Sequence, residues 1–111
     1  MVEIITNKTE INKIITEKIK GKKLIFTKYY QLGIMQKGLS HEKVLQIFPQ
    51  FDKIVAIEKE IIKNRDVGYE LFYDLSNNTF FSIATIPKEH NVLVIHAVEY
   101  KRDLRYRFKQ K

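Results

Sequence analysis

The sequence contains no cysteine, only two prolines and four glycines, and no long hydrophobic run. Without cysteine, disulfide bonds, thiolate metal sites and a cysteine nucleophile are all excluded. The longest apolar runs, such as residues 92–95, are far shorter than the roughly 18 residues of a membrane-spanning helix. The first residues lack a basic stretch followed by an apolar core, so no signal peptide is visible and we expect a cytoplasmic protein.

Motifs for cofactor binding are also missing. The glycines are isolated from one another and form no Walker or dinucleotide-binding fingerprint, which disfavours ATP- and NAD-dependent chemistry. The histidines, which are His41, His90 and His96, show no ligand spacing. The sequence therefore predicts neither a metal nor another cofactor.

What the chain does have is an apolar core composition and an excess of positive charge. With 111 residues, 44% of them hydrophobic, it suits one folded domain over residues 1–111. Its 20 Lys and Arg against 13 Asp and Glu leave a net charge of +7. This charge indicates an anionic partner, which is a nucleic acid, an acidic protein or an anionic membrane surface, unless it only keeps the surface soluble.

Residues 1–21 contain a predicted N-terminal amphipathic helix. Isoleucines line one helical face at Ile11, Ile14, Ile15 and Ile19. Asn7 is suited to cap the first turn, with Glu10 three residues later, and Gly21 suits a left-handed C-terminal cap. Residues 2–5 are either a short edge strand or an irregular lead-in.

Residues 24–44 predict a strand followed by a helix pair. The run Leu24-Ile25-Phe26 is short, apolar and β-prone. Thr27 is a suitable cap for a helix over residues 28–37 that ends at Gly38, and Ser40 caps a second helix that ends before Pro49.

From residue 53 onward, the hydrophobic period changes to two. Four successive strands are expected within residues 54–62, 69–75, 81–85 and 92–100. Turn-forming residues separate them, which predicts an antiparallel meander. The expected fold class is α+β, with the N-terminal helix, the short strand and the helix pair packed on one face of a mainly antiparallel four-stranded sheet. The other face of the sheet stays free for function.

Residues 101–111 form a basic C-terminal segment. It holds six basic residues, including three of the four arginines, and one acid. Guanidinium groups suit bidentate recognition of phosphate better than ammonium groups do. In a strand, Arg105 and Arg107 would face away from Tyr106 and Phe108, whereas a helix or a loop would bring charge and aromatic rings together. The alternative is a solvated, frayed basic end.

Three residues in the predicted strands have acid–base potential. His96 interrupts an apolar strand on the face of Val94 and Val98, as either a hydrogen-bonded core histidine or a general acid–base group. Glu58 and Glu60 lie two apart on one strand face, a spacing that fits metal binding or acid–base work but is more typical of a solvent face. Metal-free chemistry by Arg, Lys, Tyr and His suits RNA, because the 2′-hydroxyl is a built-in nucleophile.

The stretch over residues 26–44, FTKYYQLGIMQKGLSHEKV, resembles the helix pair of a small branch of the RelE/ParE toxin superfamily. In that branch, a strand and this helix pair precede an antiparallel sheet of three or four strands. The resemblance implies a RelE-like core over residues 22–106. It also implies similarity to toxins that cleave messenger RNA or target gyrase and that are normally paired with an antitoxin.

The resemblance also suggests which residues form the site. Tyr29 stands where the family has a helix histidine, Lys37 stands where it has the arginine before Gly38, and its other arginine falls on Gln31 or Gly33. The expected catalytic residues are Arg105, Arg107, Tyr106, His96 and Tyr29. The expected nucleic-acid-binding residues are Lys101, Arg102, Arg65, Lys109 and Lys37. In this scheme arginines hold phosphate, Tyr106 stacks on a base, and His96 or Tyr29 handles the proton.

The sequence thus leads to one main hypothesis and two alternatives. The first is a RelE-like type II toxin, a metal-free endoribonuclease that acts on messenger RNA, free or on the ribosome, and is neutralised by an antitoxin. The second is a noncatalytic RelE-fold module that binds nucleic acid or protein, which the missing histidine and arginine favour. The third is an interaction protein whose edge strand or N-terminal helix docks on a partner. A homodimer is left open, and no membrane partner is expected.

Overall fold

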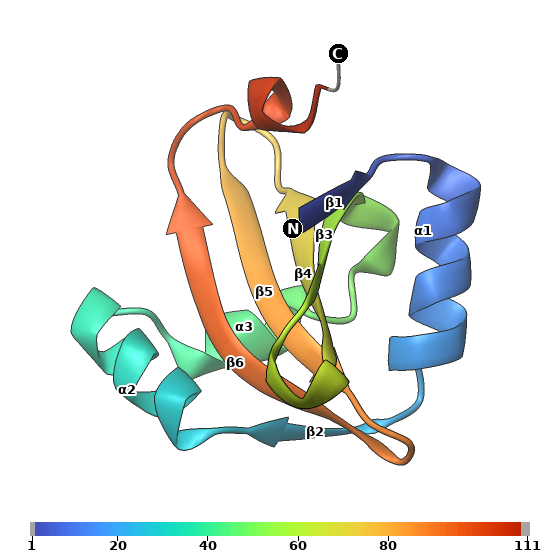
Figure 1. Cartoon of the computed structure of the whole chain (residues 1–111). Helices are drawn as coiled ribbons and strands as arrows, with labels where there is room; N and C mark the ends of the chain where they lie inside the picture. The colour runs from blue at the N-terminus through green and yellow to red at the C-terminus, as the bar shows by residue number, and fades with distance from the viewer. Residues whose placement is uncertain (1, 110–111) are drawn as a thin grey trace.

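A six-stranded, mostly antiparallel open sheet forms the centre of the structure, with strand order β1-β3-β4-β5-β6-β2 (Figure 1). The structure is a computed structural model that describes residues 2–109. The strands are β1 (Val2–Ile5), β2 (Lys23–Phe26), β3 (Ile54–Ile61), β4 (Val67–Asp74), β5 (Phe80–Pro87) and β6 (Asn91–Tyr100). The α-helices are α1 (Lys8–Ile14), α2 (Lys28–Lys37) and α3 (His41–Ile47).

The α+β class and the antiparallel meander of β3 to β6 are confirmed, but the predicted number of four strands was wrong. β1 pairs antiparallel with β3 at one edge of the sheet. β2 pairs parallel with β6 at the other edge. These strands have only four residues each, so periodicity alone does not reveal that they join the sheet.

The helix ends follow the predicted capping residues. The side chains of Asn7, Thr27 and Ser40 each accept a hydrogen bond from the backbone N–H three residues later. Gly38 ends α2 in the left-handed conformation, with φ of 65°, which glycine adopts without a Cβ penalty. The N-terminal helix differs from expectation only at its end, where α1 continues as a π-helical turn over Ile15–Ile19.

All three α-helices pack on the same face of the sheet. Ile11 of α1, Tyr30 of α2 and Val44 of α3 belong to one buried cluster. On the sheet side, this cluster includes Ile57 and Leu71, which are paired neighbours on β3 and β4. The main core therefore lies between the helices and the sheet, as Figure 1 shows by the placement of the helices.

The C-terminal segment covers part of the opposite face. It forms a 3₁₀ turn, η4 (Arg105–Phe108), at one end of the sheet (Figure 1). Leu104 and Phe108 are buried in a second cluster with Ala56, Phe72 and Phe80. The alternative of a solvated, frayed end is therefore wrong for this part of the tail, because its apolar residues are anchored on the sheet.

We expect Phe108→Ala to lower the free energy of unfolding by about 3 kcal/mol, because it removes a buried ring that packs against Phe72 and Phe80. Tyr106→Ala in the same turn is the control: its side chain is 82% exposed, so the loss should stay below about 0.5 kcal/mol. Urea denaturation measures both. Equal stabilities of the two variants would contradict the anchoring of η4.

Candidate functional site

The face of the sheet opposite the helices carries a hollow lined by acidic residues and a histidine. The strand register places Glu58, Glu70, Ala84 and His96 side by side in one row across β3, β4, β5 and β6. These four residues and Glu60 are among those that line a hollow of about 190 Å³. Sequence reasoning missed Glu70, although its alternation with the buried Tyr69 and Leu71 already assigned it to the other face.

The position of His96 depends on an irregularity in the pairing of β5 with β6. Ala84 pairs with His96, but Thr85 pairs with Val94, so Ile95 is an extra residue. Ile95 and His96 consequently both line the hollow, as is usual at a β-bulge. Val94 is buried in the main core, so the prediction that it shares a face with His96 was wrong.

His96 is half-buried, and its environment favours the neutral imidazole. Burial is the main cause that lowers the pKa of His96; the nearby ammonium of Lys37 lowers it further, and the carboxylate of Glu70 acts in the opposite direction. Its Nδ1 atom is buried and has no hydrogen-bond partner among the described residues. Lys37 donates a hydrogen bond from Nζ to the backbone oxygen of Ala97, at 3.0 Å. A neutral histidine under the influence of a carboxylate is able to accept a proton and to be stabilised once charged.

Arg107, from the C-terminal turn, contacts one of the residues that line the hollow. Its Nε and Nη2 atoms lie 2.9 and 3.1 Å from the two carboxylate oxygens of Glu58. Its guanidinium carbon lies 5.0 Å from the centre of the Phe72 ring. The hydrogen bonds with Glu58 raise the pKa of Arg107. The structure therefore brings Arg107 to the face that holds His96, but a protein carboxylate already occupies its guanidinium fork.

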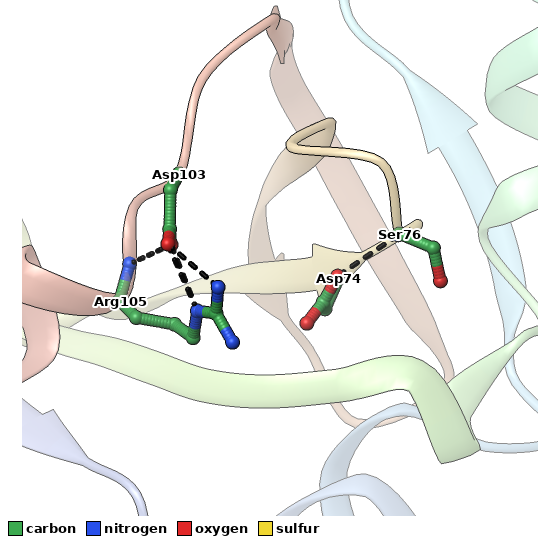
Figure 2. Close-up of polar contacts among 4 residues, drawn as sticks. All are labelled: Asp74, Ser76, Asp103 and Arg105. Atoms are coloured by element: carbon green, nitrogen blue, oxygen red, sulfur yellow. Dashed lines mark hydrogen bonds and ion pairs between the residues drawn. The ribbon is translucent and has the colours of Figure 1, made fainter.

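Arg105 is also engaged by an acid of the chain. Figure 2 shows its guanidinium and backbone N–H both directed at Asp103, with Nη2 2.7 Å from Oδ2. These hydrogen bonds lower the pKa of the Asp103 carboxyl to about 2. In the same view, Asp74 accepts a hydrogen bond from the backbone N–H of Ser76, at 2.9 Å. Arg105 thus helps to shape the start of η4.

Two cations of the segment lie beside aromatic rings, of which Tyr106 is exposed and Tyr100 is partly buried. Lys109 Nζ is 5.0 Å from the centre of the Tyr106 ring. The Arg102 guanidinium carbon is 5.8 Å from the centre of the Tyr100 ring, and Lys101 is exposed. Among the residues that the structure describes, neither Arg102 nor Lys109 forms an ion pair. We call Lys101, Arg102, Tyr106 and Lys109 the C-terminal platform.

Two predicted site residues lie elsewhere. Tyr29 is exposed on α2, in the helix layer, and lines a different hollow with Leu32. Arg65 is exposed in the short turn between β3 and β4 and does not line the hollow that contains His96. Because the helices cover the opposite face of the sheet, the structure does not bring Tyr29 together with His96.

Two general features of the described residues bear on the site. Over residues 2–109, no group of three or more His, Asp or Glu side chains is arranged to hold a metal ion. None of the helices in this range has the length and the apolar character needed to span a membrane.

We expect His96 to titrate below the usual histidine pKa of about 6.5, because burial disfavours its charged form. Glu70→Gln should lower this pKa further, since it removes the carboxylate that favours the imidazolium. The ring-proton shifts in an NMR titration report both values. A His96 pKa at or above about 6.5, or no change in the variant, would disprove the described environment.

Comparisons with known proteins do not assign the chain to a family. No family model matches the chain, and no curated protein or solved structure matches it either.

Proposed function

We propose that this protein binds single-stranded RNA through the C-terminal platform. The observation that supports this most is Tyr106, whose side chain is 82% exposed and lies next to the unpaired cation of Lys109. Aromatic rings of this kind stack on unpaired bases, while neighbouring cations hold the phosphates. The net charge of +7 is consistent with an anionic partner.

The anchoring of η4 supports the same proposal. Phe108 holds the turn on the sheet from within, and Arg105 and Arg107 hold it through Asp103 and Glu58. Tyr106 is thereby presented on an ordered turn rather than on a loose end. Presenting the ring in advance reduces the entropy that binding would cost. In this proposal Arg105 and Arg107 position the platform and do not themselves hold phosphate.

A second candidate function is metal-free cleavage of RNA in the hollow, which is favoured by the position of Glu70 and His96 in one row across the sheet, with Ala84 of β5 between them. Neutral His96 would accept the proton of a 2′-hydroxyl, and Glu70 would stabilise the imidazolium. As the 2′-oxygen attacks phosphorus, the proton would pass to the departing 5′-oxygen. Arg107 would have to exchange Glu58 for the phosphate. A RelE-like toxin neutralised by an antitoxin is the more specific form of this candidate.

For binding, we expect the Arg102→Ala/Lys109→Ala variant to bind single-stranded RNA more weakly and to reduce the slope of log affinity against log salt by about 1 for each lost phosphate contact. Tyr106→Ala should weaken binding by about 1–3 kcal/mol through the lost stacking. Fluorescence anisotropy with a labelled RNA measures both. Lys13→Ala/Lys18→Ala, which removes two exposed charges from the N-terminal helix region, is the matched control. Equal losses in the control and the platform variant would refute the proposed interface.

For cleavage, we expect RNA incubated with the protein in EDTA to yield products that end in a cyclic phosphate, if the second candidate is right. His96→Ala and Glu70→Gln should each slow this reaction by about 100-fold or more, while His90→Ala should not. Gel electrophoresis of the labelled RNA gives the rates. Binding without any product would eliminate the second candidate and leave the binding proposal standing.

A further inference from the structure

The outer face of α2 exposes three large apolar side chains. Tyr29, Leu32 and Met35 have exposed fractions of 71%, 60% and 77%. They follow one another at intervals of three residues, so they lie on one side of the helix. The other side of α2 is already used, since Tyr30 is buried in the main core. We call Tyr29, Leu32 and Met35 the α2 patch.

Hollows lie on both sides of this patch. One of about 250 Å³ is lined by Tyr29, Leu32, Gly33 and Gln36. Another of about 390 Å³ is lined by Phe26, Tyr30, Gln31, Ile34, Met35 and His41. The α2 patch is therefore a ridge between two depressions that are mostly apolar. The two depressions can accept side chains that protrude from the surface of a partner.

The stretch of sequence that contains the patch has charge of only one sign. Residues 18–41 contain six lysines and no aspartate or glutamate. These lysines are Lys18, Lys20, Lys22, Lys23, Lys28 and Lys37. Lys28 and Lys37 are the first and last residues of α2, so each end of the helix carries a lysine, and Lys37 also donates a hydrogen bond to the backbone oxygen of Ala97. The next acid is the exposed Glu42 at the start of α3.

We propose that the α2 patch docks an acidic amphipathic helix of a partner protein. Apolar residues at spacings of three and four on that helix would enter the two hollows, and its carboxylates would meet the lysines. The proposal goes beyond RNA binding, because the patch lies in the helix layer and not on the C-terminal platform.

Other occupants fit this surface less well. A second copy of the chain would bring the lysines of both copies together, and like charges oppose association. An anionic membrane would meet the cations, but it would leave the two depressions unfilled. RNA would find a single aromatic ring there, since Leu32 and Met35 offer no stacking surface.

The experiment uses a synthetic helical peptide of about 18 residues, with leucines on one face and glutamates elsewhere. The first comparison peptide replaces every glutamate with lysine. The second keeps the composition but spreads the leucines around the helix. We expect the acidic peptide to bind the full chain at least tenfold more tightly than either, by fluorescence anisotropy. In amide NMR spectra, the largest shift changes should fall within residues 28–38.

The Leu32→Glu/Met35→Glu variant should lose at least tenfold in affinity for the acidic peptide. Leu45→Glu alters an exposed leucine of α3 outside the patch. This variant should bind the acidic peptide with the same affinity as the unaltered protein. Both change only exposed side chains, and an unchanged urea midpoint confirms that each variant is folded. The affinity for RNA should stay the same in both, so that failure of this proposal and failure of RNA binding are separate results.

Four results would overturn the proposal. The first is no binding of the acidic peptide, and the second is equal binding of the lysine peptide. The third is a dimer in sedimentation experiments that the Leu32→Glu/Met35→Glu variant abolishes, because the occupant would then be a second copy. The fourth is binding to phosphatidylserine vesicles that the same variant abolishes, because the occupant would then be a membrane surface.

Discussion

The arrangement of side chains on the open face of the sheet, which is the face opposite the helices, depends on the burial of Phe108 and Leu104. All three α-helices cover one face, so the apolar residues Phe72 and Phe80 on the other face need a different cover. The C-terminal segment supplies this cover. Its packing also sets the directions in which the neighbouring side chains of the segment point. With Phe108 turned inward, Arg107 extends along the sheet to Glu58, whereas Tyr106 points to solvent. A packing requirement of the sheet thus places the most basic part of the chain beside its acidic hollow.

The distribution of charge matters more than the net value of +7. Glu58, Glu60 and Glu70 gather on the open face, where the phosphates of RNA would meet negative charge. Arg105 and Arg107 of the C-terminal turn are paired with carboxylates. Arg102 and Lys109 of the platform form no ion pair among the described residues. Because the carboxylates of the hollow would repel the phosphates of RNA, we assign nucleic-acid binding to the platform. We consider the hollow only as the site of the second candidate function, which is the cleavage of one phosphodiester bond.

Helix α2 has apolar residues on both sides, and this combination has a structural meaning. Tyr30 belongs to the core, while Tyr29, Leu32 and Met35 remain exposed on a helix of ten residues. Scattered exposed apolar residues are ordinary on a protein surface. Three at helical spacing, with hollows on both sides and a lysine at each end of the helix, form the surface that we propose binds an acidic amphipathic helix.

Local features of the chain determined the helix boundaries and the meander. Asn7, Thr27 and Ser40 cap the helices through bonds that span three residues, and the period of two marks β3 to β6. Such signals act between neighbours in sequence, so they can be seen without the fold. The prediction that His96 is a site residue came from the same local pattern, and it stays a prediction.

Only the tertiary structure decided the rest, because it depends on pairing between distant segments. The edge strands β1 and β2 join the sheet through partners far along the chain. The extra residue Ile95 turns Val94 and His96 to opposite faces. Glu70 and His96 share one row of the sheet only through the register of three strands, and Arg107 meets Glu58 across 49 positions. No local pattern encodes these contacts, since they arise from how the strands align and from where the C-terminal turn finds an apolar surface to cover.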